Sequence, residues 1–351
     1  MDDLLAVCAQ IDPVDESWAV ETQRLLDAKT KPRRSLGRLE DLACQIAAIR
    51  RTPTPEVGDK AIVVMAADHG VATAGVSAYP QEVTGQMVLN FARGGAAINV
   101  LARHAGVRLV VVDMGIREPV EADGVLQRRL GPGTADFRRG AAMTREQAEE
   151  GLVSGIAIAR ELVDEGISLI GIGEMGIGNT TSSSALISAF TGTPPKEVTG
   201  TGTGVDEETR GRKIEAIRHA IEHNRPDPAD AIDVLAKLGG FEIAGLAGVV
   251  LGAASRHIPV LADGFIASVA ALVAVRLAPA AKGYVIASHR STEPGHQAVL
   301  VALGARPVLD LELRLGEGTG AALAMPLIDA ALRILAEMAS FEDAGVTDTG
   351  H

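Results

Sequence analysis

The chain has 351 residues, of which 47% are hydrophobic and 3% aromatic. A core of this composition is built from Ala, Val, Leu and Ile, as in buried parallel strands. The net charge of −12 argues against nucleic acid or an acidic membrane as partner. Two cysteines, Cys8 and Cys44, exclude a disulfide framework. The acidic start and the lack of an uncharged apolar run of about 20 residues predict a cytoplasmic protein.

Both chain ends carry helical patterns. In residues 1–58, SWAVETQRLLDAKT and LGRLEDLACQIAAIRR have apolar residues at three-and-four spacing. The basic turn between them, from Lys29 to Arg38, is interpreted as a solvated surface, a subunit contact or the rim of an anion site. A long amphipathic helix is predicted after Gly320. We expect 1–58 and 321–351 to form a small helical domain, and 59–320 a large α/β domain carrying the active site.

From Lys60 onward, apolar strands alternate with helical patterns. The strands are predicted at 61–67, 107–114, 167–173, 257–263, 283–288 and 305–312. This alternation predicts a Rossmann-like, mostly parallel, doubly wound sheet, whose ligands bind beyond the carboxyl ends of the strands. His69 and His289 follow strands there, but no paired spacing supports a metal site. We interpret them as hydrogen-bonding loop residues and expect neither metal nor cofactor.

The stretch ISLIGIGEMGIGNTTSSS, which begins at Ile167, predicts a strand, a glycine loop and a helix entrance. This arrangement presents backbone N–H groups and a helix dipole to a phosphate. Gly171, Gly173 and Gly176 match the dinucleotide fingerprint, but no acidic residue ends a strand about 20 positions later. The spacing also resembles a P-loop, with Asn179 where the lysine belongs. A phosphate site is favoured over a turn without a ligand.

Three charged side chains are candidates for function. Lys213 follows a second glycine loop, VTGTGTG, and is either the cation that the first loop lacks or a surface lysine. Glu317 lies in the glycine turn LGEGTGA, and Glu174 lies in the first glycine loop. Each of these carboxylates is either a general base or a turn acid that faces water.

Several segments together resemble one enzyme family. They are AADHGVATAGVSAYPQEVTGQMVLNF, GIGEMGIGNTTSSSAL, VTGTGTG, ASHRSTEPGH and LGEGTGAALA, and the likeness runs from about Lys31 to near the C-terminus. The chain resembles the nicotinate-nucleotide–dimethylbenzimidazole phosphoribosyltransferases of cobalamin biosynthesis. The resemblance implies a homodimer that transfers phosphoribose from nicotinate mononucleotide to 5,6-dimethylbenzimidazole. The products would be nicotinate and α-ribazole 5′-phosphate.

The resemblance also assigns roles to residues. Glu317 matches the family's catalytic carboxylate, and Glu174 is a second carboxylate that would stabilise positive charge at the ribose. The 5′-phosphate would be held by Gly176, Gly178, Asn179, Thr180, Thr181, Gly202, Gly204, Lys213 and Ser291. The benzimidazole slot would be lined by Tyr79, Gln86, Met175 and Leu315. Leu is more usual in the family where Met175 stands, and Met gives this wall more flexibility.

The residue types agree with the chemistry of such a transfer. Nicotinate leaves as a neutral ring nitrogen and needs no acid, whereas the attacking benzimidazole must lose a proton to a base. Direct displacement would invert C1′. Alternatives are the same transfer to another benzimidazole, a purine or a phenol, and a nucleotide-binding module without chemistry. A dinucleotide-dependent oxidoreductase is disfavoured because the ribose-binding acid is missing.

Overall fold

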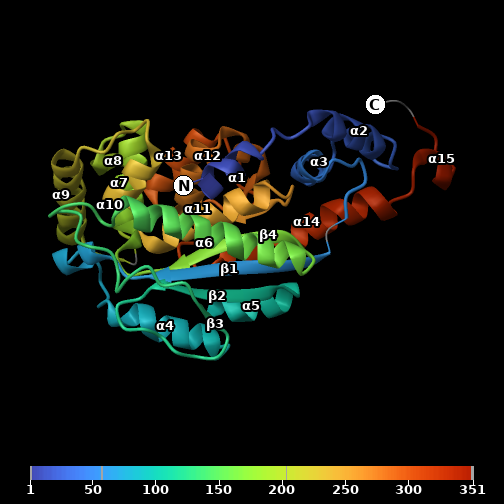
Figure 1. Ribbon diagram of the computed structural model, residues 1–351. Coiled ribbons are helices and arrows are strands. Elements are labelled where there is room, and N and C mark those ends of the chain that lie inside the picture. The colour runs from blue at the N-terminus through green and yellow to red at the C-terminus, as the bar shows by residue number, and fades with distance from the viewer. Residues whose placement is uncertain (1, 57, 203, 349–351) are drawn as a thin grey trace.

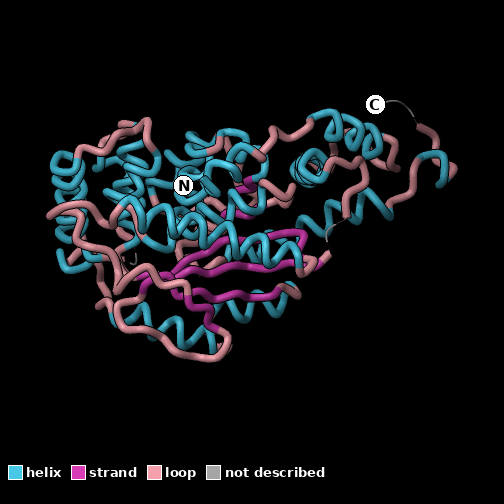
Figure 2. Tube along the Cα trace, viewed as in Figure 1, coloured by secondary structure: helices cyan, strands magenta, loops and turns pink. Residues whose placement is uncertain are grey.

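The computed structural model describes residues 2–56, 58–202 and 204–348. Its described strands form one six-stranded, all-parallel sheet in the order β3-β2-β1-β4-β5-β6. The strands are β1 (Asp59–Ala67), β2 (Arg108–Gly115), β3 (Val125–Gln127), β4 (Ile167–Met175), β5 (Val260–Ala262) and β6 (Val285–Ala287). Helices cover both faces of the sheet (Figure 2), so the doubly wound α/β prediction is confirmed.

The helices of one layer are α1 (Asp2–Ala9), α6 (Arg145–Asp164), α7 (Asn179–Thr191), α8 (Pro195–Val198), α9 (Glu207–Asn224), α10 (Ala231–Leu238), α11 (Phe241–Ala254), α12 (Phe265–Leu277) and α13 (Pro294–Leu303). On the other face lie α3 (Arg38–Arg50), α4 (Glu82–Ala92), α5 (Ala97–Ala105) and α14 (Thr319–Glu337), joined by α2 (Glu16–Asp27). The short elements η1 (Gly70–Ala74), η2 (Pro279–Tyr284) and α15 (Phe341–Ala344) complete the chain.

Strand β1 shows why both faces are covered. Its alternate side chains point to opposite faces, as the twofold period of a strand requires. Val63 and Met65 belong to the core under α6 and α11, whereas Ile62 and Val64 belong to the core under α4, α5 and α14. A strand buried on both faces reads as a continuous apolar run, which is why this sheet was predictable from the sequence.

Helices α6 and α11 pack unusually closely at glycines. An added Cβ on Gly155 of α6 would lie 1.9 Å from the Gly245 carbonyl of α11, and one on Gly248 would lie 2.0 Å from the Leu152 carbonyl. Every residue of α11 is buried. Small residues thus replace the aromatic side chains that the composition lacks, and this helix pair supports β1 and β4 from one side.

Helices from the two chain ends meet beside the sheet. Helices α2, α3 and the second half of α14 lie together at one end of the molecule (Figure 1). The first half of α14 packs on the sheet, and α1 lies apart, against α6 and α11. The division into a 1–58 plus 321–351 domain and a 59–320 domain stays a prediction, and residues 1, 57 and 349–351 lie outside the described part.

Helix α14 is also long and apolar enough to cross a membrane by length and composition, with a mean hydropathy of 1.5 in its most apolar window. However, 56% of that window is buried inside the fold. This burial is the behaviour of a core helix.

One predicted strand is not formed, and one observed strand was not predicted. Segment 305–312 is not a strand: it pairs with the chain after β6 at one isolated parallel bridge, between His289 and Leu309. Pro307 has no N–H to donate and interrupts a longer ladder. Strand β3 was missed because it has three residues, two of them exposed, and so lacks a buried apolar run.

Candidate active site

The candidate site lies at the carboxyl edge of the sheet, beyond the ends of β4, β5 and β6. The carboxyl edge of the strands is where open α/β sheets bind ligands. A cavity is enclosed by the end of β4, the following glycine loop, the start of α12 and the segment before α14. The predicted site residues that line it are Glu174, Met175, Gly176, Asn179, Thr180, Gly202, Ser291 and Leu315. The structure therefore brings together residues that lie up to 141 positions apart in the sequence.

The glycine loop leads from β4 into α7 through Gly178, whose φ of 101° lies in the left-handed region. A Cβ on Gly176 would lie 2.5 Å from the Ala67 carbonyl, so only glycine lets the loop sit against the end of β1. Several loop N–H groups already have partners: Ile177 N donates to Thr84 Oγ1, and Asn179 N donates to the Gly176 carbonyl. The loop thus offers a phosphate fewer free N–H groups than the glycine pattern suggested.

Lys213 is a buried cation behind this loop. It lies on α9 and is 1% exposed, and its Nζ donates to Thr180 Oγ1 at 3.0 Å and to the Gly200 carbonyl at 3.5 Å. Burial lowers the pKa of Lys213, and the charge of Glu293 opposes that effect. A Cβ on Gly202 would lie 3.2 Å from Nζ. The structure excludes the surface-lysine interpretation and places the cation beside two residues assigned to the phosphate.

Besides Lys213, three described residues of the predicted phosphate set are not on the cavity wall: Gly178, Thr181 and Gly204. Thr181 is fully buried. Gly204, with a φ of 102°, lies in the turn before α9, beside residue 203, which lies outside the described part.

Ser291 is held by a histidine with a defined tautomer. The Ser291 N–H donates to His296 Nδ1 at 2.9 Å, so this ring nitrogen carries no proton. Burial lowers the pKa of His296 to about 3, so the ring is neutral and its Nε2–H faces Ser268 Oγ at 3.1 Å. The hydrogen bond to the buried His296 therefore holds the backbone at Ser291 in place beside the cavity.

Glu174 is the last residue but one of β4, and its side chain is buried. Its carboxyl accepts a short hydrogen bond from the side-chain amide of Asn179. Burial raises the pKa of Glu174 well above its usual range, and the nearby charges of Glu242, Asp263 and Glu317 add to this effect. Burial and these neighbouring charges therefore favour the protonated form of Glu174.

Glu317 occupies a strained turn next to the cavity. Gly316, Glu317 and Gly318 have φ values of 83°, 64° and 85°, which a residue other than glycine rarely adopts. The Glu317 N–H donates to the Glu174 carbonyl, and the Gly318 N–H donates to Asp263 Oδ2 at 3.0 Å. The turn therefore ties the two predicted carboxylates to one another through the backbone.

The Glu317 side chain is 4% exposed, and its Oε2 has no hydrogen-bond partner within the described chain. Burial raises the pKa of Glu317 to about 7, with a smaller contribution from Asp263 and an opposing one from the backbone of Ile98. The interpretation as a turn acid facing water is therefore wrong. A buried carboxyl with a free oxygen and a pKa near neutrality is suited to accept a proton.

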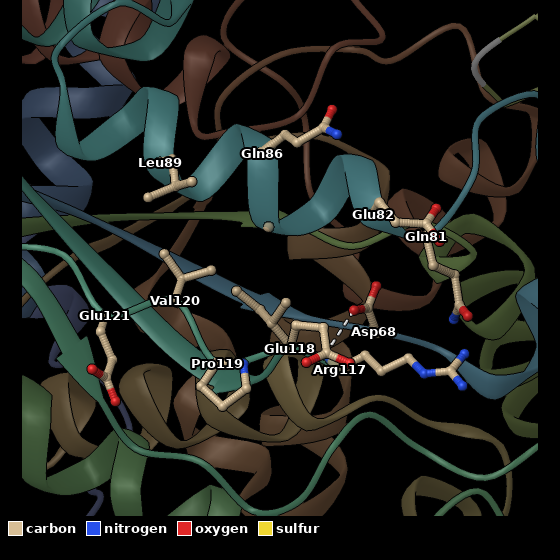
Figure 3. A pocket seen from close by; sticks show the side chains of 12 residues that line it. Asp68, Gln81, Glu82, Gln86, Leu89, Arg117, Glu118, Pro119, Val120 and Glu121 are labelled. Carbon is tan, nitrogen blue, oxygen red and sulfur yellow. Dashed lines mark hydrogen bonds between the residues drawn. The ribbon is translucent and has the colours of Figure 1, made fainter.

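The four residues assigned to the benzimidazole slot do not share one pocket. Met175 and Leu315 line the cavity beside Glu174, although Leu315 is 57% exposed. Tyr79 is 52% exposed. Gln86 lines a separate cavity of about 800 Å³, where α4 faces the segment after β2 (Figure 3). That cavity is lined by Asp68, Gln81, Glu82, Gly85, Gln86, Leu89, Ile116, Arg117, Glu118, Pro119, Val120 and Glu121.

Sequence reasoning gave no role to three residues that shape the cavity. Arg314 lines it and donates to the Gly202 carbonyl at 3.2 Å. Glu293 lines it with a buried Oε2 that lacks a partner in the described chain. Asp263 accepts from the N–H groups of Gly318, Gly320 and Ala321. Asp263 directly follows an apolar strand, and this position in the sequence could have indicated a role at the ligand-binding edge of the sheet.

No group of three or more His, Cys, Asp or Glu side chains in the described ranges is placed to hold a metal ion.

Comparisons with known proteins identify the family. The phosphoribosyltransferase family model matches residues 11–346. The chain is 54% identical over 340 residues to the nicotinate-nucleotide–dimethylbenzimidazole phosphoribosyltransferase of Roseiflexus sp. strain RS-1, covering 97% of this chain and 96% of the relative. The like-named protein of Geobacter sp. strain M21 is 52% identical over 348 residues, covering 99% of this chain and all of the relative.

A crystal structure of the like-named enzyme from Thermus thermophilus has a TM-score of 0.90 and 46% identity, covering 95% of this chain and 99% of that one. A second structure from the same organism, described as CobT, has a TM-score of 0.91 and 48% identity, covering 94% of this chain and 99% of that one. The chain therefore belongs to the nicotinate-nucleotide–dimethylbenzimidazole phosphoribosyltransferase family.

Proposed function

We propose that this phosphoribosyltransferase transfers phosphoribose from nicotinate mononucleotide to 5,6-dimethylbenzimidazole, with Glu317 as general base and inversion at C1′. The observation that carries the proposal is the Glu317 carboxyl: it is buried, has an unpartnered oxygen and has a pKa of about 7. A base with a pKa near the working pH accepts a proton most effectively.

The donor's phosphate lies in the part of the cavity where Thr180, Gly202 and Ser291 meet. Lys213 supports this position because its buried Nζ already points to the Thr180 hydroxyl. Arg314, which lines the cavity, adds a second cation beside Gly202. These two cations let a protein of net charge −12 bind a doubly negative group.

The reaction is a displacement at C1′. A ring nitrogen of the acceptor forms a bond to C1′ while the bond from C1′ to the nicotinate nitrogen breaks, and its electron pair stays on the departing ring. The other acceptor nitrogen becomes acidic, and Glu317 takes its proton. Glu174, once ionised, stabilises the positive charge that develops at the ribose. Attack from the face opposite to nicotinate converts the β-nucleotide into an α-product.

The acceptor lies between the wall formed by Met175 and Leu315 and the Glu317 carboxyl. The exposure of Leu315 leaves this side open, and we propose that a second subunit of a homodimer covers it. The dimer is part of the proposal.

The test mixes the protein with nicotinate mononucleotide and dimethylbenzimidazole without added metal and resolves the products by chromatography. Nicotinate released in step with an α-configured ribazole phosphate supports the proposal. Release without that product assigns another acceptor or hydrolysis, and a panel of benzimidazoles, purines and phenols then identifies the acceptor. Folded protein that binds the nucleotide and releases nothing is a binding module, and the proposal fails.

A further inference from the structure

A buried histidine–glutamate pair lies outside the cavity described above. His69 is the second residue after β1, and Glu242 lies in the first turn of α11. Their closest atoms, Nε2 and Oε1, are 2.6 Å apart, and the side chains are 1% and 0% exposed. Neither residue is on the cavity wall, and the proposed chemistry uses neither. A pair with so little contact with water is costly to bury, so its position calls for an explanation.

The imidazole of His69 is enclosed by glycines. An added Cβ on Gly240 would lie 2.4 Å from His69 Cε1, and one on Gly178 would lie 3.1 Å from His69 Cβ. A Cβ on Gly176 would lie 3.4 Å from Nε2. The ring is thus packed between the start of α11 and both glycines of the loop that follows β4. The Gln81 amide also donates to the His69 carbonyl at 2.7 Å.

The same pair acts on Glu174 through its charge. Of the charges that raise the pKa of Glu174, Glu242 has the largest effect. The other charged groups that face Glu174 are Asp263, after β5, and Glu317, before α14, while Asn179 on α7 donates a hydrogen bond. A Gln at position 242 would keep the size of the side chain and remove this charge.

We propose that His69 and Glu242 are positioning residues for the transfer: they hold the loop from Gly176 to Gly178 against the end of β1 and place a carboxylate behind Glu174. The pair touches no substrate in this arrangement. The loop carries the donor's phosphate, and Glu174 adjoins its reacting carbon. The inference rests on the proposed function for the roles of these two elements.

The experiment compares His69→Gln and Glu242→Gln with the wild-type protein. Gln at position 69 can still donate to Glu242 but lacks the ring that fills the space between the glycines. Glu150→Gln, an identical chemical change on the exposed side of α6, is the matched control. For each protein, calorimetry with nicotinate mononucleotide in two buffers of different ionisation enthalpy measures affinity and the number of protons released. Steady-state assays separate the donor KM from kcat.

His69→Gln is expected to raise the donor KM by about tenfold, because a displacement of ~1 Å in a positioning element can cost ~10²-fold. Glu242→Gln is expected to release fewer protons on donor binding, because Glu174 without that neighbouring charge is already more ionised in the free enzyme. Glu150→Gln should match the wild type in both assays. A purely structural role would change neither proton release nor the ratio of KM to kcat.

The proposal is overturned if both variants, folded as judged by circular dichroism, keep the wild-type donor KM and proton release. If the single variants do not fold, the double variant His69→Gln, Glu242→Gln, which pairs two amides, is measured instead. Wild-type behaviour of that variant, or loss of folding in all three, assigns the pair to stability alone. Absence of turnover in the wild type would refute the proposed function, whereas unchanged variants of an active enzyme refute only this inference.

Discussion

Glu317→Gln tests the central feature of the site, because it should lower activity and raise stability together. The folded protein raises the pKa of this carboxyl from 4.5 to about 7. Between these values the folded state binds more protons than the unfolded state, so the stability contributed by Glu317 is fully present below pH 4.5 and is lost as the pH rises through 7. At ~1.36 kcal/mol per unit, a shift of about 2.5 units corresponds to about 3 kcal/mol.

Glutamine does not ionise, so the variant does not lose this stability. The free energy of unfolding of Glu317→Gln should therefore equal that of the wild type near pH 4.5, within the effect of the substitution itself. It should exceed the wild type by about 3 kcal/mol near pH 8. Turnover at neutral pH should fall by ~10²–10⁴-fold, the usual contribution of a general base, while nucleotide binding is retained.

The assay is urea unfolding followed by circular dichroism at both pH values, with Glu150→Gln as the exposed control. Only the difference between variant and wild type is interpreted, because titrating groups that do not interact with Glu317 cancel in it. Glu174 does not cancel, since the charge of Glu317 raises its pKa, and its effect has the same sign as the expected difference. A variant that is no more stable than the wild type near pH 8 would show that Glu317 does not ionise in a buried position. Wild-type turnover in the variant would exclude it as the base.

Three further predictions concern the same site, and a fourth concerns an exposed helix position. In the wild type, kcat/KM should rise with pH to a plateau with an apparent pKa of about 7, because Glu317 must lose its proton to act; a flat profile would contradict this. Lys213→Met should raise the donor KM far more than the acceptor KM, measured by varying each substrate in turn; equal changes would exclude the phosphate role. Gly173→Ala should destabilise the fold and reduce turnover, because its Cβ would lie 2.2 Å from Gly318 N. Gly211 occupies an exposed position of α9, where an added Cβ would meet no atom within 4 Å. Gly211→Ala should therefore stabilise the protein by up to about 1 kcal/mol, measured by urea unfolding.

The fold was predictable where burial leaves a regular pattern in the sequence. The apolar runs of β1, β2 and β4 are buried on both faces, and each was predicted to within two residues at either end. Strands β5 and β6 have three residues each, shorter than their apolar patterns. Segment 305–312 has the composition of a strand, but whether a neighbour pairs with it is a tertiary property that composition does not encode.

The site was predictable as a set of residue types but not as an arrangement. The sequence left Lys213 open as a surface lysine and Glu317 as a turn acid, because burial depends on residues far away in the chain. Lys213 contacts Thr180 at the start of α7, and Glu317 lies near Ile98, more than 200 positions away. The position of Gln86 in a separate cavity is likewise a consequence of how α4 packs, which no local pattern contains.

The buried carboxyls of the site also bear on how an acidic protein would bind the anionic donor proposed above. Four carboxyls, those of Glu174, Glu242, Asp263 and Glu317, are buried near the phosphate loop, and four full negative charges there would repel a phosphate. The negative charge of each carboxyl is reduced or compensated. The pKa of Glu174 is raised, and that of Glu317 is about 7. Asp263 accepts hydrogen bonds from three backbone N–H groups, and Glu242 is paired with His69. Because protonated carboxyls carry no charge, the site of the free enzyme is far less negative than its composition. In the proposed reaction, the positive pyridinium nitrogen of the donor would draw out the Glu174 proton, so this negative charge would form only after the phosphate is bound.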